Sequence, residues 1–264
     1  MKARAPTDTP CVMIRDLRTI IEGWNYEPGK ISVRKIIGRD GREKIQTRID
    51  LGVLQLECQG RPDGRRPHDC ESLLEYHERR LREHVAIYGS DEDFVLSPEE
   101  CQALRHEAYL YYQRYLSLYV LEEYDGVQRD TARNLRVIEL CTRYAASERD
   151  RATLRPQRAY VMMMHTRARA QLALSNGLPD VALRIVDEGI AGLENLAADD
   201  AADPYRAEAR TLYALRREIL ERLPEDAPAR LRAELELALA TEDYERAAKL
   251  RDRLAQHPTT AATD

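Results

Sequence analysis

The sequence predicts a mainly α fold, a solenoid of helical hairpins that carries a two-stranded β-ribbon at its N-terminal end. Two observations predict it. From residue 68 to residue 223, apolar residues recur at helical spacing in long segments separated by short polar or Gly/Pro-containing stretches. Residues 30–66 instead alternate apolar and polar side chains, as β-strands do. The predicted parts are a lead-in with a short helix (1–29), a basic β-hairpin (30–66), a helical body (67–223), a C-terminal helical hairpin (228–257) and a disordered tail (258–264).

Length and composition limit the class of protein. The 264 residues can bury one large core or two modest ones. Charged residues make up 33% of the chain, but the formal net charge is only −5, which is not the balance of a protein that coats nucleic acid. The five cysteines are widely spaced, and there is no signal-like N-terminus and no apolar run of about 18 residues. We therefore expect a cytoplasmic protein without a membrane span.

The N-terminal part begins with apolar residues at helical spacing between residues 11 and 22, which predict a short helix. Trp24 and Tyr26 follow in a turn and are expected to pin this lead-in onto the body. Asp40-Gly41 then lies between two alternating runs, which is a strong signal for a hairpin turn. The second run changes face at Gly52, where we expect a bulge or bend. A two-stranded ribbon is unstable alone, so it should lie against helices or self-associate.

The ribbon carries the strongest charge bias of the chain, a net charge of +5 over residues 30–66. Basic β-ribbons can enter a nucleic-acid groove, where Arg side chains reach phosphates or base edges. The alternative is a solvated face whose charges discourage edge pairing, and the interleaved acids favour that alternative. The candidates for nucleic-acid contact are Arg34, Arg39, Arg42, Lys44 and Arg48.

The helical body is predicted to contain six long helices. Ser97, Pro98 and Glu100 mark one helix start, because a Ser cap, a Pro in the first turn and a Glu at the third position form a capping sequence. Other boundaries are expected at polar or Gly/Pro stretches, including Asp125-Gly126. The predicted helices span residues 69–88, 98–124, 129–147, 156–176, 179–197 and 204–222.

One of these helices is rich in tyrosine, in a chain with fourteen Tyr but one Phe and one Trp. Tyr109, Tyr112 and Tyr119 share a helix face and are candidates for lining a peptide groove, since tyrosines give contact area at low entropic cost. The alternative, which we favour, is that such residues divide between the core and its rim.

Signatures of metal sites and enzymes are weak. Cys58, His68, Cys70 and His77 form the one conceivable metal cluster, but their spacing matches no common zinc pattern. The chain also lacks the phosphate-binding loop, the nucleophile elbow, the His-Glu-x-x-His helix and the dinucleotide fingerprint. We therefore expect no bound metal, no cofactor and no enzymatic activity.

The C-terminal hairpin shows two apolar stripes of helical period. The first contains Leu231, Leu235, Ala238 and Leu239, and the second begins with Tyr244 and Ala247; the alanines permit close helix approach. The intervening Thr-Glu-Asp sequence suits a helix cap. Two short helices bury little surface between themselves, so the hairpin should pack on its own chain or on a partner.

This segment resembles the UVR motif, which the UvrB and UvrC subunits of the bacterial excision nuclease share with some Clp-protease partners. The resemblance implies docking rather than chemistry, and the rest of the chain lacks the catalytic motifs expected of UvrB or UvrC themselves. The matching positions are Leu231, Leu235, Ala238, Asp243, Tyr244, Glu245, Ala247, Ala248, Leu250, Arg251 and Asp252.

A second resemblance lies in the body. Ala170, Gly177, Ala182 and Gly189 are similar to the small-residue pattern of a tetratricopeptide (TPR) repeat, although it covers one hairpin and the period is nearer 50 than about 34 residues. The body is therefore expected to be TPR-like.

Together these features predict a bacterial adaptor in excision repair or Clp-type quality control, with a nucleic-acid-binding regulator as the alternative. The expected partner is a protein with a complementary helical hairpin, or a second copy of the chain. The residues expected to bind it are Leu235, Ala238, Tyr244, Ala247, Ala248, Leu250, Arg251 and Asp252.

Overall fold

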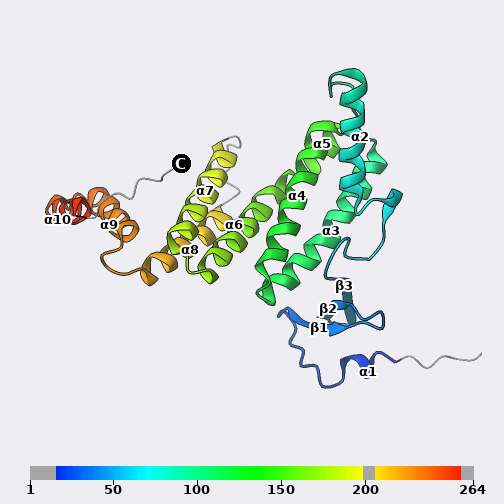
Figure 1. Ribbon diagram of the computed structural model, residues 1–264, viewed down its shortest axis with the longest axis horizontal. Coiled ribbons are helices and arrows are strands. Elements are labelled where there is room, and N and C mark those ends of the chain that lie inside the picture. The colour runs from blue at the N-terminus through cyan, green and yellow to red at the C-terminus, as the bar shows by residue number, and fades with distance from the viewer. Residues whose placement is uncertain (1–15, 199–205, 257–264) are drawn as a thin grey trace, which may run out of the picture.

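The computed structural model describes residues 16–198 and 206–256, and its described part is mainly helical, as predicted (Figure 1). The tail at 258–264, and the part of the first predicted helix before residue 16, lie outside the described residues. The elements are α1 (Arg18–Ile21), β1 (Ser32–Ile37), β2 (Glu43–Ile49), β3 (Gly52–Glu57), α2 (Leu73–Tyr88), α3 (Pro98–Val120), α4 (Tyr124–Tyr144), α5 (Glu148–Thr153), α6 (Arg158–Ser175), α7 (Pro179–Ala198), α8 (Arg206–Arg222), α9 (Pro228–Ala240) and α10 (Tyr244–Ala255), with short 3₁₀ turns η1 (Pro67–Asp69) and η2 (Arg155–Gln157).

The N-terminal sheet has three antiparallel strands in the order β1-β2-β3, so the predicted two-stranded ribbon was wrong. The first turn is as expected, with Gly41 at φ 75°. The second run does not bulge at Gly52; the chain reverses at Asp50 and Leu51, and Ile49 pairs with Gly52. An Asp-Leu pair lacks the Asn-Gly or Asp-Gly signature of a tight hairpin, so this turn could not be predicted from the sequence.

The sheet packs one face on the helical body. Ile45 and Leu56 belong to the core that α3, α4, α6, α7 and α8 build, and the hydroxyl groups of Thr47 and Ser117 are 2.6 Å apart. The lead-in covers the opposite face. Trp24 donates its indole N–H to Ser32 Oγ at 2.8 Å. This bond fastens the lead-in to the sheet, whereas we predicted that Trp24 would pin it to the helical body.

Three helical hairpins, α3/α4, α6/α7 and α9/α10, share one turn geometry. In each, a residue just past the first helix has a positive φ: 58° at Glu122, 72° at Gly177 and 58° at Glu242. The next residue then donates its N–H to the carbonyl five positions back, as in a Schellman cap. These bonds are Glu123 N to Leu118 O at 2.9 Å, Leu178 N to Ala173 O at 2.9 Å, and Asp243 N to Ala238 O at 2.8 Å.

The turn at Glu122 corrects the predicted boundary at Asp125-Gly126. Both residues lie inside α4, which begins at Tyr124. A Cβ at Gly126 would come within 2.8 Å of Leu118 Cδ1 on α3. This glycine therefore serves close helix packing rather than chain reversal.

Other helix bounds differ by a few residues. The capping box of Ser97 and Glu100 opens α3 as predicted. The helix predicted from residue 69 begins at Leu73, because Ser72 caps it and η1 occupies the preceding residues. The short helix α5 was not predicted.

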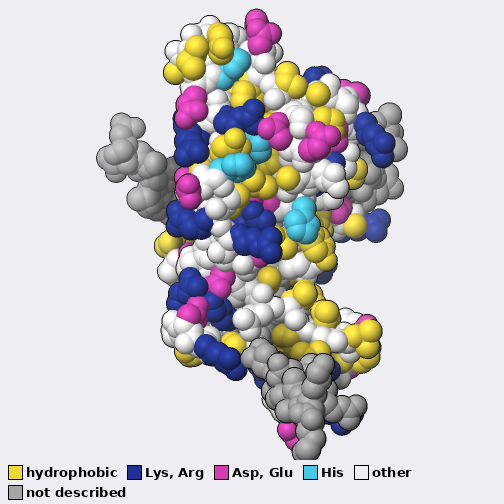
Figure 2. Space-filling view, turned by 90° about the vertical axis from the view of Figure 1, so that its right-hand side faces the viewer, with side chains coloured by type: hydrophobic (Ala, Val, Ile, Leu, Met, Phe, Trp, Pro, Cys, Tyr) yellow, Lys and Arg dark blue, Asp and Glu magenta, His cyan; other side chains and the backbone are white. Residues whose placement is uncertain are grey.

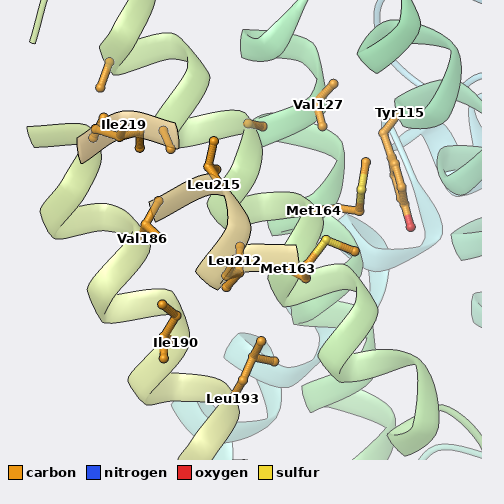
Figure 3. Close-up of a cluster of buried hydrophobic side chains, with 14 of the residues drawn as sticks. Tyr115, Val127, Met163, Met164, Val186, Ile190, Leu193, Leu212, Leu215 and Ile219 are labelled. Atoms are coloured by element: carbon orange, nitrogen blue, oxygen red, sulfur yellow. The ribbon is translucent and has the colours of Figure 1, made fainter. Parts of the chain in front are cut away.

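The main core lies between the hairpins, and α6 is its central helix (Figure 3). Met163 and Met164 of α6 are buried beside Tyr115 of α3, and α7 and α8 supply Val186, Leu212 and further aliphatic side chains. A second cluster, around Leu96, Leu104 and Cys141, joins α3 and α4 to the residues that follow α2.

Candidate protein-interaction site

The C-terminal hairpin of α9 and α10 extends from one end of the helical row (Figure 1). Pro228 begins α9, and the Asp243 carboxylate accepts the Arg246 N–H at 3.1 Å to cap α10. An acidic cap favours the positive end of the helix dipole, as the sequence predicted.

The hairpin has a small core of its own, separate from the main core. Leu231, Ala238, Ala247 and Leu250 are at most 5% exposed and pack with Leu235 and Leu254. The two alanines, Ala238 of α9 and Ala247 of α10, both belong to this seam between the helices. Small side chains at that position let the backbones approach, so the hairpin closes without help from a partner.

One side of the hairpin is polar and internally paired. The Glu234 carboxylate on α9 accepts bonds from Arg230 at 3.2 Å and from Arg246 of α10 at 3.1 Å. Burial raises the pKa of Glu234, but the bonds from Arg246 and Arg230 outweigh it and leave that pKa lowered. This bridge ties the two helices together on that side, where helical periodicity also places Leu237.

The other side exposes apolar surface, which we call the Leu239–Tyr244 face. Helical periodicity places Leu235 and Leu239 on it from α9, and Tyr244, Ala248 and Arg251 from α10. Tyr244 is 67% exposed and Leu239 is 52% exposed. Arg251 reaches its neighbour Asp252 at 3.0 Å and lies at the edge. An aromatic anchor, aliphatic neighbours and a charged rim are the usual parts of a binding surface.

The eight residues predicted to bind a partner fall into two groups in the structure. Ala238, Ala247 and Leu250 lie in the closed seam, and Leu235 is half-buried at its edge. The exposed ones are Tyr244, Ala248, Arg251 and Asp252. Leu239 was in the predicted apolar stripe but was not among the predicted binding residues. Its spacing of four residues from Leu235 is the signal that could have placed it on the same face as that predicted binding residue.

Tyrosines of the body do not form one groove. Tyr109 and Tyr112 line a cavity between α3, α4 and the start of α6. Tyr119 lies two turns further along α3, where Arg167 sits 4.6 Å above its ring and Tyr124 packs edge-on at 5.7 Å.

Two of the cations predicted to contact nucleic acid bind acids of their own sheet. Lys44 is 5% exposed and bonds to Asp40 at 2.8 Å and to Glu57. Arg42 bonds to the same Asp40 at 2.8 Å. The bonds from Lys44 and Arg42 also hold the pKa of Asp40 well below its usual range.

The lead-in engages two further cations. Arg34 lies 4.1 Å above the Trp24 ring, and Arg48 lies 5.2 Å from the Tyr26 ring. Arg39, at the hairpin tip, is exposed. Four of the five cations predicted to contact nucleic acid therefore contact residues of the sheet, its first turn or the lead-in.

No metal cluster is present within residues 16–198 and 206–256, where no three His, Cys, Asp or Glu side chains are grouped to hold an ion. Of the predicted cluster, His68 stacks on Tyr76 at 4.0 Å and Cys70 is buried. Across the same residues, none of the helices combines the length and apolar character needed to cross a membrane.

A second exposed apolar cluster lies at the far end of α2, at the top of Figure 2. Ile87 and Tyr88 are 73% and 71% exposed there. This end of α2 closes at Gly89, which has a left-handed φ of 75°. The C-terminal hairpin is the better-defined candidate, because it pairs two helices around a core of their own.

Comparison with known families agrees with this choice. The model of the UVR family, described as the UvrB/uvrC motif, matches residues 229–256, which are α9, its turn and α10. The search of curated proteins and the search of solved structures gave no match. The protein thus contains a UVR motif, a protein-interaction element, at the end of a mainly helical chain.

Proposed function

We propose that this UVR-containing protein is a non-catalytic adaptor that docks a partner protein on the Leu239–Tyr244 face. The observation that carries the proposal is a hairpin with a closed core of its own and an exposed apolar side. Because the seam is filled from within the hairpin, the partner binds outside it. The helical body is then free to engage a second protein.

The chemistry of the face fits a helical partner. Leu235 and Leu239 form a ridge of residues four apart, and Tyr244 and Ala248 form a parallel one across the turn. Ridges of this kind interlock with the grooves of a second helix pair. The partner is accordingly a complementary helical hairpin, from another protein or from a second copy of this chain. The UVR motif supports a partner in excision repair or in Clp-type quality control.

A matched pair of leucine substitutions tests the proposal. Leu239→Asp, combined with Tyr244→Ala, places a charge on the proposed face and removes its anchor. Leu237→Asp is the control, because Leu237 is 57% exposed, like Leu239 at 52%, but lies on the polar side. Leu250→Asp would be uninformative, since Leu250 is 4% exposed and the change would open the hairpin core.

Each full-length variant is used as bait for affinity capture of its partners in the presence of nuclease. The oligomeric state of the purified variant is then measured by light scattering. We expect the wild type and Leu237→Asp to retain the same partner or the same dimer, and the Leu239→Asp/Tyr244→Ala protein to lose it. If all three retain identical partners and mass, the Leu239–Tyr244 face is not the docking surface.

A nucleic-acid-binding role for the ribbon stays a prediction. The bonds of Lys44 and Arg42 to Asp40, and of Arg34 to Gln46, weigh against it. The nuclease step separates the two functions. Partners that disappear with nuclease would be held through nucleic acid, whereas a UVR-type contact is insensitive to it.

A further inference from the structure

A cavity of about 420 Å³ lies in the helical body, remote in sequence from the UVR hairpin. Its walls come from α3, α4, η2 and the start of α6. The volume is in the range of small-molecule sites, which run from roughly 300 to 1,000 Å³. Four tyrosines, Tyr109, Tyr112, Tyr115 and Tyr160, line it together with apolar side chains.

The four tyrosine rings contact one another around the cavity and form part of its wall. Tyr112 is central: Tyr109 stacks on it at 6.1 Å, Tyr115 meets it edge-on at 5.4 Å, and Tyr160 of α6 lies at 6.3 Å. These separations are within the range of favourable aromatic contacts. A flat aromatic ring entering the cavity would gain the same kind of contact from several sides.

Tyr115 supplies the most deeply buried of the tyrosine hydroxyl groups in the cavity wall. Its side chain is 1% exposed, and no hydrogen bond reaches its hydroxyl from the described residues. In Figure 3 the hydroxyl lies at the end of the ring away from Val127. Burial raises the pKa of Tyr115, so the hydroxyl is protonated at neutral pH and can donate. A hydroxyl that lines the cavity can donate a hydrogen bond to an acceptor on a molecule that enters it.

Asn134, Arg105 and Gln157 are the other polar, non-tyrosine side chains in the cavity wall, and they narrow the class of ligand. Asn134 is already used, because its amide donates to Ala108 O at 2.9 Å and accepts from Arg133 at 3.0 Å. Arg105 bonds to Asp150 through Nη1 at 2.8 Å, which leaves its other N–H groups as donors. Gln157 also lines the cavity, and its amide can donate or accept. Tyr115 and Arg105 therefore supply hydrogen-bond donors within the aromatic walls.

We propose that this cavity is a binding site for a small planar aromatic molecule that carries a hydrogen-bond acceptor, with the Tyr115 hydroxyl as donor and Tyr109, Tyr112 and Tyr160 as stacking walls. The site is independent of the UVR hairpin, so its test and the capture experiment above fail separately.

Quinoline and naphthalene form a matched probe pair, because they share a fused-ring shape and differ by one acceptor nitrogen. Both are titrated into the full chain and followed by ligand-observed NMR. Tyr115→Phe removes the donor and keeps the ring. We expect it to lower the quinoline-to-naphthalene affinity ratio by roughly three- to tenfold, the net worth of one hydrogen bond, and to leave naphthalene binding within about twofold.

A second variant tests the walls. Tyr109→Ala, at a position 56% exposed, should weaken both probes without disturbing the core, whereas Tyr88→Ala, at a 71% exposed tyrosine of α2, should weaken neither. The proposal is overturned if the wild type shows no saturable binding of either probe. It is also overturned if Tyr115→Phe leaves the affinity ratio unchanged, or if Tyr88→Ala matches Tyr109→Ala.

Discussion

Glu107 of α3 is completely buried, yet four groups satisfy its carboxylate. It accepts the Leu73 N–H at 2.9 Å and the Leu74 N–H at 3.2 Å, both at the start of α2. Arg61, from the loop after β3, lies 3.2 Å from it, and Arg133 of α4 bonds to it as well. One side chain thus joins the sheet exit, α2, α3 and α4, which explains why a charge is tolerated there.

Glu107→Gln should lower the free energy of unfolding by about 3 kcal/mol, because it keeps the volume but removes the carboxylate that pairs with the buried Arg133, whereas Arg61 keeps Asp63 at 2.9 Å. Urea denaturation of the full chain measures this. Glu78→Gln is the control: its Arg136 partner is 56% exposed, and surface pairs contribute about 1 kcal/mol or less. Equal losses in the two variants would mean that burial of the Glu107 charge has no special role.

At the scale of elements, close approach of helices depends on particular small residues. Gly189 of α7, one of the TPR-like positions, has no room for a side chain, since a Cβ would lie 2.5 Å from Cγ2 and Oγ1 of Thr166 on α6. Thr166 is β-branched and buried, so it cannot turn away easily. Gly192, one turn later, would meet only the mobile end of Met162 at 3.0 Å.

Gly189→Ala should therefore destabilise the protein by about 1–2 kcal/mol, because overpacking outweighs the better helix propensity of alanine. Gly192→Ala, in the same helix, should be neutral or stabilise by up to about 1 kcal/mol. Chemical denaturation compares them, and Thr166→Ala should rescue Gly189→Ala. A stabilising Gly189→Ala would show that α6 and α7 can move apart at no cost.

At the scale of the whole molecule, the C-terminal hairpin is joined to the body by limited contacts. Ala229 packs at the edge of the main core, and Glu236 lies 3.8 Å from Arg216 of α8. The small core of Leu231, Ala238, Ala247 and Leu250 is otherwise its own. A docking element so attached can lose its structure without unfolding the body.

Leu250→Ala should remove amide-exchange protection from α9 and α10 and leave α4 and α6 protected as in the wild type. The reason is that truncating a buried leucine costs about 2–5 kcal/mol, which a core of this size cannot supply. Hydrogen exchange read by mass spectrometry resolves the segments, with the exposed Leu237→Ala as control. Loss of protection in α4 and α6 as well would make the hairpin part of one cooperative unit.

The candidate site was readable from the sequence in outline but not in orientation. Periodicity showed that Leu235, Ala238 and Tyr244 belong to two amphipathic helices, and the motif-like run, which includes Leu250, marked the docking element. It did not separate the residues that close the seam, such as Ala238 and Leu250, from Tyr244 on the outer side. A periodic stripe shows which side chains share a helix face, but tertiary packing decides which other helix covers that face.

The sequence by itself determined the helical class, the capping box of α3 and the two-helix form of the C-terminal motif, because these depend on neighbours within a few turns. Only the tertiary structure decided the third strand, the place of Gly126 inside α4, and the pairing of the ribbon's Lys44 with Glu57. Each of these rests on contacts between residues distant in sequence or on a turn without a characteristic residue pair. The same applies to the Tyr115 cavity, whose walls come from three separate helices and the turn before the last of them.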